Sequence, residues 1–354
     1  MADNKATSKA QEFKALSKKD QQRKIGDLIL NNAMYIIIAI AIIFITVKQP
    51  KFISLSSIVN IISLTAAKLP IALGIGGCIV LTGTDISAGR VVGLAACISA
   101  SLLTTVFKVF PNMTSAMPIP VVLLIVLGVG AAVGFVNGFS VAKFKLHPFI
   151  VTLSTQLITY GIILMYLMNG VNNGQTLSGL TDSYRSLITG TLFTIGGVAI
   201  PRYVLYAVIL TAVMWVIWNK TTFGKNLYAV GGNAEAASVS GISVFKVTVG
   251  AFILAGILYG FGSWLECIRM VGSGSAAYGQ GWEMDAIAAC VVGGVSFTGG
   301  IGKISGVVVG VFIFTALTYS LTILGIDTNL QFVFSGIIIL VAVALDCLKY
   351  VQKK

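Results

Sequence analysis

Apolar runs separated by short polar gaps fill most of this sequence of 354 residues. A run of about 20 apolar residues is long enough for a helix to cross the hydrocarbon core of a bilayer. The pattern therefore predicts an all-α, polytopic membrane protein with about ten transmembrane helices. The predicted spans are 29–47, 58–82, 88–107, 120–142, 148–169, 202–218, 246–270, 284–298, 303–324 and 330–348.

Three segments depart from a simple span. The second predicted span contains Lys68 and Pro70, which favours an interfacial helix followed by a shorter membrane helix. The eighth, 284–298, is short and rich in glycine, as broken or partly inserted helices are. The low-charge segment 186–200 is a candidate for a loop that dips into the membrane without crossing it.

Composition supports the membrane assignment. Hydrophobic residues make up 56% of the chain and charged residues 10%, whereas a soluble domain carries about 25% charged residues. The net charge of +12 comes mainly from Lys and Arg in the short gaps between apolar runs. This placement indicates an orientation signal rather than a surface for nucleic acid.

The same charges predict the orientation, because Lys and Arg favour cytoplasmic loops. Ten spans after a cytoplasmic N-terminus place most of them inside, whereas an odd number would leave the basic C-terminal end outside. We therefore predict cytoplasmic basic tails at 1–28 and 349–354 around a transmembrane domain at 29–348. Lys68 and Arg269 are expected near outer helix ends.

Residues for catalysis and ion coupling are scarce. His147 is the single histidine, and the sequence contains neither a C-x-x-C pair nor a P-loop motif, so metal chemistry and ATP hydrolysis by this chain are disfavoured. Asp85, Glu266, Asp285 and Asp346 lie in or beside apolar runs, but none at the centre of an unbroken span, where ion coupling places such groups. We predict a transport subunit that is not an enzyme, binds no cofactor or metal, and is driven by a partner. A self-sufficient channel or ion-coupled carrier is less favoured.

The longest cytoplasmic gap, 219–246, contains signals for a short helix. Asn233 is suited to cap it and Gly241 to end it in a left-handed conformation. Between them, 234–239 favours helix, and Glu235 in the first turn complements the helix dipole. The small side chains leave two interpretations: an ordinary loop between spans, or a surface that a partner approaches closely.

Longer blocks of sequence carry a resemblance. Over nearly its whole length the chain resembles the sugar permeases of the ribose/galactose/arabinose/xylose branch of ABC importers, and within that branch most the members that carry galactose and methyl-galactoside. The matching blocks are GTDISAG at 83–89, NGFSVAKFKLHPFIVTLST at 137–155, NKTTFGKNLYAVGGNAEAASVSGI at 219–242, and MDAIAACVVGGVSFTGG at 284–300, with WNKTTFGKN, DAIAACVVGGVSF and VALDCLKY supporting the galactose members.

One short motif within the loop is similar to the E-A-A-x-x-x-G signature with which ABC permeases receive their ATPase. It comprises Glu235, Ala236, Ala237 and Gly241, and the Ile-x-Leu-Pro that follows the signature is replaced by Ile-Ser-Val-Phe. The resemblance implies that these residues, with Asn233, couple the permease to the ATPase.

The resemblance also implies the partners and the cargo. Two copies of the permease form the pore in the bacterial cytoplasmic (inner) membrane, and an extracytoplasmic sugar-binding protein delivers the cargo. A separate subunit with two fused nucleotide-binding domains uses ATP and Mg. The expected cargo is galactose, glucose or methyl-galactoside; ribose, another pentose or a nucleoside is the alternative.

Polar residues near the membrane supply candidates for the translocation path. Asp85 and Ser87 interrupt the apolar run before the third span and are suited either to cap that helix or to line the path. A charged group at the bilayer centre costs about 2.5–3.5 kcal/mol. Asp85 is therefore expected at an edge, in a cavity or paired, with Arg90 as an available cation.

A second cluster is predicted at the outer ends of the seventh and eighth spans. It comprises Trp264, Glu266, Trp282, Glu283 and Asp285. Aromatic faces with carboxylates suit a sugar path, docking of the binding protein, or anchoring at the interface, and all three interpretations stay open.

Glycines at four-residue spacing predict seams where helices pack closely. The stripes are Gly134 and Gly138; Gly256 and Gly260; and Gly302, Gly306 and Gly310.

Overall fold

The computed structural model describes residues 21, 43, 46–269 and 274–351, and helices dominate this part of the chain. The elements are η1 (Pro50–Ile53), α3 (Leu55–Val80), α4 (Ala88–Leu103), α5 (Ile119–Phe144), α6 (Pro148–Leu167), α7 (Asp182–Thr189), β1 (Thr191–Ile195), β2 (Val198–Pro201), α8 (Arg202–Lys220), α9 (Thr222–Gly232), α10 (Ala234–Val239), α11 (Val244–Arg269), α12 (Trp282–Val292), α13 (Ile304–Ile323) and α14 (Thr328–Val351).

Six of the described helices are long and apolar enough to cross a membrane: α3, α5, α6, α8, α11 and α13. α4 and residues 329–341 of α14 are shorter apolar segments. The predicted multi-pass helical architecture is thus confirmed, and the predicted span 29–47 lies largely outside the described residues. α12 has only 11 residues, which agrees with the short, Gly-rich character expected of 284–298.

The predicted glycine seams join helices in pairs. A methyl group on Gly134 of α5 would lie 2.1 Å from the carbonyl oxygen of Phe252 on α11, and one on Gly256 would lie 2.0 Å from that of Gly130. Similarly, a methyl group on Gly310 of α13 would lie 2.0 Å from the carbonyl oxygen of Ala289 on α12. The two backbones of each pair therefore meet directly, and these stripes are internal seams of one chain.

α3 corrects two expectations about the second span. Residues 55–80 form one helix that passes through Pro70, although an interfacial helix followed by a separate membrane helix was expected. Lys68 lies 13 residues after Leu55 and 12 before Val80, in the middle of this helix and not near its outer end. The helix tolerates Lys68 because its ammonium pairs with a carboxylate, whereas Arg269 does end α11.

The segment 186–200, a candidate for a loop that dips into the membrane, contains the end of α7 and a β-hairpin. Its first residues complete α7, and the rest form an antiparallel hairpin in which Ile195 pairs with Val198. Gly196 and Gly197 make the two-residue turn with φ of +53° and +82°, the positive values that a tight hairpin requires. This hairpin is the described exception to the expected all-α fold.

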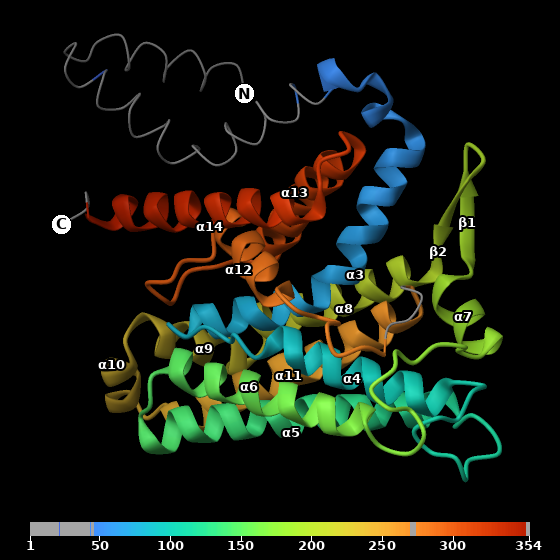
Figure 1. Ribbon diagram of the computed structural model, residues 1–354. Coiled ribbons are helices and arrows are strands. Elements are labelled where there is room, and N and C mark those ends of the chain that lie inside the picture. The colour runs from blue at the N-terminus through green and yellow to red at the C-terminus, as the bar shows by residue number, and fades with distance from the viewer. Residues whose placement is uncertain (1–20, 22–42, 44–45, 270–273, 352–354) are drawn as a thin grey trace.

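The described elements place different features at the two ends of the bundle (Figure 1). α4, α5, α6 and α11 run side by side, with α10 at one end and α7, β1 and β2 at the other. α14 ends on the same side of the view as α10. α10 and the hairpin therefore belong to opposite ends of the bundle.

Candidate functional site

The predicted short helix in the loop 219–246 is present as α10, with the expected cap. The Asn233 side-chain oxygen accepts a hydrogen bond from the amide of Ala236 at 2.9 Å. At the other end, Gly241 has a φ of +81°, and the amide of Ile242 donates to the carbonyl of Ala237 at 3.0 Å. The local sequence therefore specifies both ends of this helix.

Most residues of α10 are exposed, and one is buried in the core. Ala237 is buried in the main core cluster, whereas Glu235 and Ala236 are exposed. Val239, which sequence analysis did not single out, is 91% exposed. The helix thus presents small and apolar groups with one carboxylate, a composition that suits close approach by another protein. An apolar residue outside the buried face of a short capped helix was the sequence signal for Val239.

α9, which sequence analysis did not anticipate, joins α10 to the bundle. A methyl group on its Gly231 would lie 1.8 Å from the carbonyl oxygen of Val80, at the end of α3. The same oxygen accepts a hydrogen bond from the amide of Gly300 at 2.8 Å, and the Tyr228 hydroxyl donates to the carbonyl of Gly302 at 2.9 Å. The contacts of α9 therefore connect α10 to the end of α3 and to the segment that leads into α13.

Asp85 and Ser87 form a buried polar chain with residues of α5 and α6. Asp85 Oδ1 accepts from the Ser87 amide at 3.0 Å and from its hydroxyl at 2.6 Å. The Asn137 amide nitrogen donates to the Ser87 hydroxyl oxygen at 2.9 Å, and Thr155 Oγ1 donates to Asn137 Oδ1 at 2.6 Å. Asp85 is 1% exposed, so this geometry favours bracing of the segment before α4 over contact with a passing solute.

Ser87 stands at the N-cap of α4, but its side chain makes no capping bond. Arg90 contacts other groups than the predicted Asp85. Its guanidinium lies 4.3 Å from the centre of the Tyr160 ring and donates to the carbonyl of Ala276 at 2.9 Å. Of the alternatives left open for Asp85, an edge, a cavity or pairing with Arg90, the structure gives a buried carboxylate whose partners are the hydroxyl and amide of Ser87.

Three members of the predicted outer cluster are buried. Trp264 is 5% exposed, with Tyr184 and Phe261 beside its ring, and the Tyr184 hydroxyl donates to its carbonyl. Glu266 pairs with Arg269 at 2.7 Å. Glu283, likewise buried, accepts a hydrogen bond from the side chain of Gln156 at 3.3 Å. These groups contribute to packing between α11, α12 and their neighbours.

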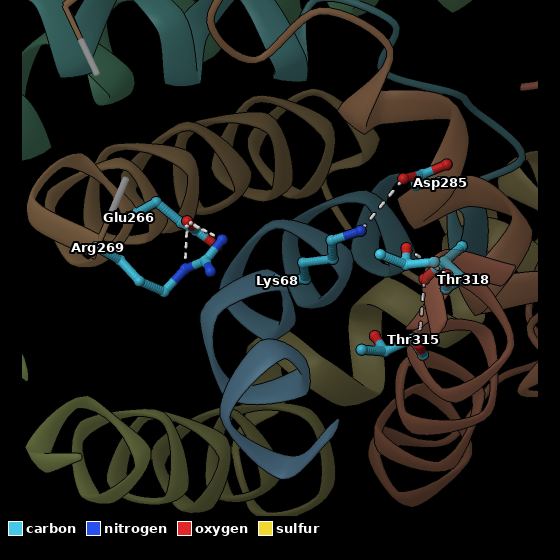
Figure 2. A network of polar contacts seen from close by, with 7 residues as sticks. Lys68, Glu266, Arg269, Asp285, Thr315 and Thr318 are labelled. Carbon is cyan, nitrogen blue, oxygen red and sulfur yellow. Dashed lines mark hydrogen bonds and ion pairs between the residues drawn. The ribbon is translucent and has the colours of Figure 1, made fainter. Parts of the chain in front are cut away.

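The other two members, Trp282 and Asp285, line open space together with Lys68. Lys68 Nζ lies 3.3 Å from Asp285 Oδ2 (Figure 2), and the centres of the Tyr278 and Trp282 rings are 4.9 Å apart. We call the pocket of about 180 Å³ beside them the polar pocket. It is lined by Lys68, Gln280, Gly281, Trp282, Asp285, Thr318, Gln331, Phe332 and Ser335.

A very small apolar pocket of about 10 Å³ shares Lys68, Trp282 and Asp285 with the polar pocket. The structure therefore separates the predicted outer cluster into a packed part and a part that lines a pocket. Lys68 was missed because the apolar run around it was interpreted as two helices. A lone lysine in the middle of an apolar run was the available signal.

Comparisons with known proteins agree with a membrane transport component. The family described as "Branched-chain amino acid transport system / permease component" matches residues 57–343. The galactose/methyl galactoside import permease protein MglC of Haemophilus influenzae is 42% identical over 94% of this chain and 99% of its own length. That of Escherichia coli K12 is 44% identical over 91% and 95%, and the ribose import permease protein RbsC of H. influenzae is 34% identical over 91% and 95%. No solved structure matches the chain.

Proposed function

The chain belongs to the family described as branched-chain amino acid transport system permease components, and we propose that its cargo is a hexose, namely galactose, glucose or methyl galactoside. It is a multi-pass transport component of the cytoplasmic (inner) membrane, not an enzyme. The cargo is supported by the identity of 42–44% to galactose/methyl galactoside permeases, against 34% to a ribose permease. Ribose or another pentose remains the second candidate.

Energy would come from a separate ATPase subunit with two fused nucleotide-binding domains, which uses ATP and Mg while this chain binds neither. The observation that carries this proposal is the exposed, doubly capped α10 on its glycine-packed support. Asn233 and Gly241 hold the ends of α10, Ala237 anchors it, and Glu235 and Ala236 face the ATPase. Closure of the ATPase on ATP would displace α10. The contacts of α9 with Val80 and Gly302, which we call the α9 junction, would pass the movement to α3 and α13.

Alternating exposure of the path would then follow from nucleotide-driven population shift, with no need for strong sugar binding by the bundle. Two copies of the chain would form the pore, and an extracytoplasmic sugar-binding protein would dock at the end that carries α7 and the hairpin. A cytoplasmic C-terminal end is supported by α14, which ends on the same side of the view as α10; about ten spans and a cytoplasmic N-terminus complete the proposed topology.

Reconstitution tests this function. The chain, its ATPase and its binding protein in proteoliposomes should accumulate labelled galactose only when ATP and Mg are supplied on the ATPase side, and labelled ribose much less. Accumulation of ribose in preference to galactose would select the second candidate. Uphill transport by the chain alone would refute an ATPase-driven permease.

A further inference from the structure

An incompletely covered ion pair lies in the middle of a membrane helix. Lys68 is at the centre of α3, which is long and apolar enough to span the membrane. The side chains of Lys68 and Asp285 are 28% and 26% exposed. Figure 2 shows the ammonium of Lys68 directed toward Asp285 on α12 and away from the Glu266–Arg269 pair.

Hydrocarbon is a poor environment for such a pair. Ionised side chains within the membrane face a bundle interior or a water-filled cavity, because contact with lipid leaves them unsolvated. Glu266 meets this requirement by full burial, since it is 0% exposed. Lys68 and Asp285 are not fully buried, so the exposed parts of their side chains must face water or a polar molecule.

The space that they face has a suitable chemistry. The polar pocket has a volume of about 180 Å³. Gln280, Thr318, Gln331 and Ser335 add neutral donors and acceptors to its wall. Trp282 adds an aromatic surface, held beside the Tyr278 ring.

The charges of the pocket select the class of ligand. Lys68 and Asp285 already neutralise one another at 3.3 Å, so an anionic or cationic ligand would leave one of them without a counter-charge. A neutral polyol leaves both charges paired with one another. Its hydroxyl groups accept from the ammonium and donate to the carboxylate at the same time, while its C–H face rests on the indole.

We propose that the polar pocket between α3, α12, α13 and α14 is a transit site for a neutral hexose, held by Lys68, Asp285 and Trp282. This proposal rests on the proposed function and specifies where along the translocation path the sugar binds.

Cysteine accessibility in the complete transporter tests this site. Cys347 is first replaced by Ala, while the buried Cys78, Cys97, Cys267 and Cys290 are kept. Ser335→Cys then places a thiol in the wall of the pocket, and Thr318→Cys serves as a second position. Leu157→Cys on α6 is the matched control, because Leu157 is 66% exposed but lies in an apolar span without a polar pocket residue.

We expect a small hydrophilic thiol reagent to label the pocket cysteines and not the control in the assembled transporter. Galactose at millimolar concentration should slow the labelling at least tenfold, whereas a charged sugar derivative such as glucuronate should not. Labelling that galactose leaves unchanged would overturn the sugar site. So would absence of labelling, or a disulfide between the introduced cysteines of two copies, which would assign this face to the dimer contact.

Uptake by charge variants separates sugar binding from structural pairing. Lys68→Met with Asp285→Leu removes both charges together, which leaves no unpaired ion and preserves the fold. We expect this double variant to retain ATPase binding and to lose uptake at low galactose concentration by roughly tenfold or more, because charge-assisted hydrogen bonds to the sugar are lost. Full uptake by the double variant would refute a role in transit, whereas failure of the unmodified complex to import galactose would refute the proposed function itself.

Discussion

Glu235 is the charged residue on the exposed surface of α10, and its carboxylate can be tested by a single substitution. Glu235→Arg should abolish ATP-driven uptake, because the introduced cation would face the ATPase in place of a carboxylate. The effect on the helix itself is small, since a charge in the first turn contributes about 0.3–1 kcal/mol. Uptake in proteoliposomes and retention of the ATPase during purification measure the two consequences.

The control for this variant is Asn219→Arg, which adds the same cation to an exposed position outside α10. We expect it to retain both uptake and ATPase binding. If Glu235→Arg also retains them, α10 is not the coupling element.

Single residues also mark the limit of prediction from the sequence. Asn233 and Gly241 were identified correctly as helix ends, because capping depends on neighbours within a few positions. Lys68 and Asp285 are separated by 217 positions, and their pairing depends on how α3 packs against α12. The sequence identified Asp285 as a candidate but provided no basis for choosing Lys68 as its partner.

At the scale of elements, α9 shows a contact between helices that overrides local helix propensity. Gly231 and Gly232 are poor helix formers, yet both belong to α9. Gly231 is required where the helix touches the end of α3, since any side chain there would meet the carbonyl of Val80. A contact between elements, rather than a local preference, determines this residue.

The neighbouring glycines allow a matched test of the junction. Gly231→Ala places a methyl group 1.8 Å from the Val80 oxygen, whereas Gly232→Ala has open space around it. Because a backbone atom cannot move aside cheaply, the first variant should displace α9 and α10. The overpacking penalty of about 1–3 kcal/mol is expected to lower the amount of sugar moved per ATP hydrolysed, and Gly232→Ala should behave as the unmodified protein. Equal transport by both variants would exclude transmission through this contact.

The seam between α5 and α11 offers a second matched pair, which concerns stability. Gly130→Ala places a methyl group 2.0 Å from the Gly256 carbonyl oxygen, whereas a methyl group on Gly128 meets nothing within 4 Å. We expect Gly130→Ala to lower the free energy of unfolding by about 1–3 kcal/mol, and Gly128→Ala to leave it unchanged or raise it slightly. Thermal unfolding of the purified proteins in detergent measures the difference. A more stable Gly130→Ala variant would mean that α5 and α11 are not in direct backbone contact.

At the scale of the whole molecule, much of the architecture followed from the apolar pattern. The predicted spans at 120–142, 148–169 and 303–324 begin and end within two residues of α5, α6 and α13. Span length is a property of local composition and is therefore readable from the sequence. The division of the outer cluster into buried Trp264, Glu266 and Glu283 and pocket-lining Trp282 and Asp285 arises only when α11 and α12 pack among their neighbours.

The two ends of the bundle can be tested for their side of the membrane, because the proposed mechanism requires α10 in the cytoplasm and the hairpin outside. Val239 on α10 is 91% exposed and Phe193 on β1 is 50% exposed, so neither substitution disturbs the core. In a background with Cys347→Ala, a membrane-impermeant maleimide should label Phe193→Cys in spheroplasts and Val239→Cys only after the membrane is permeabilised. Labelling of Val239→Cys from outside would reverse the orientation and remove α10 from reach of any cytoplasmic ATPase. Labelling of both from the same side would contradict the placement of these elements at opposite ends of the bundle.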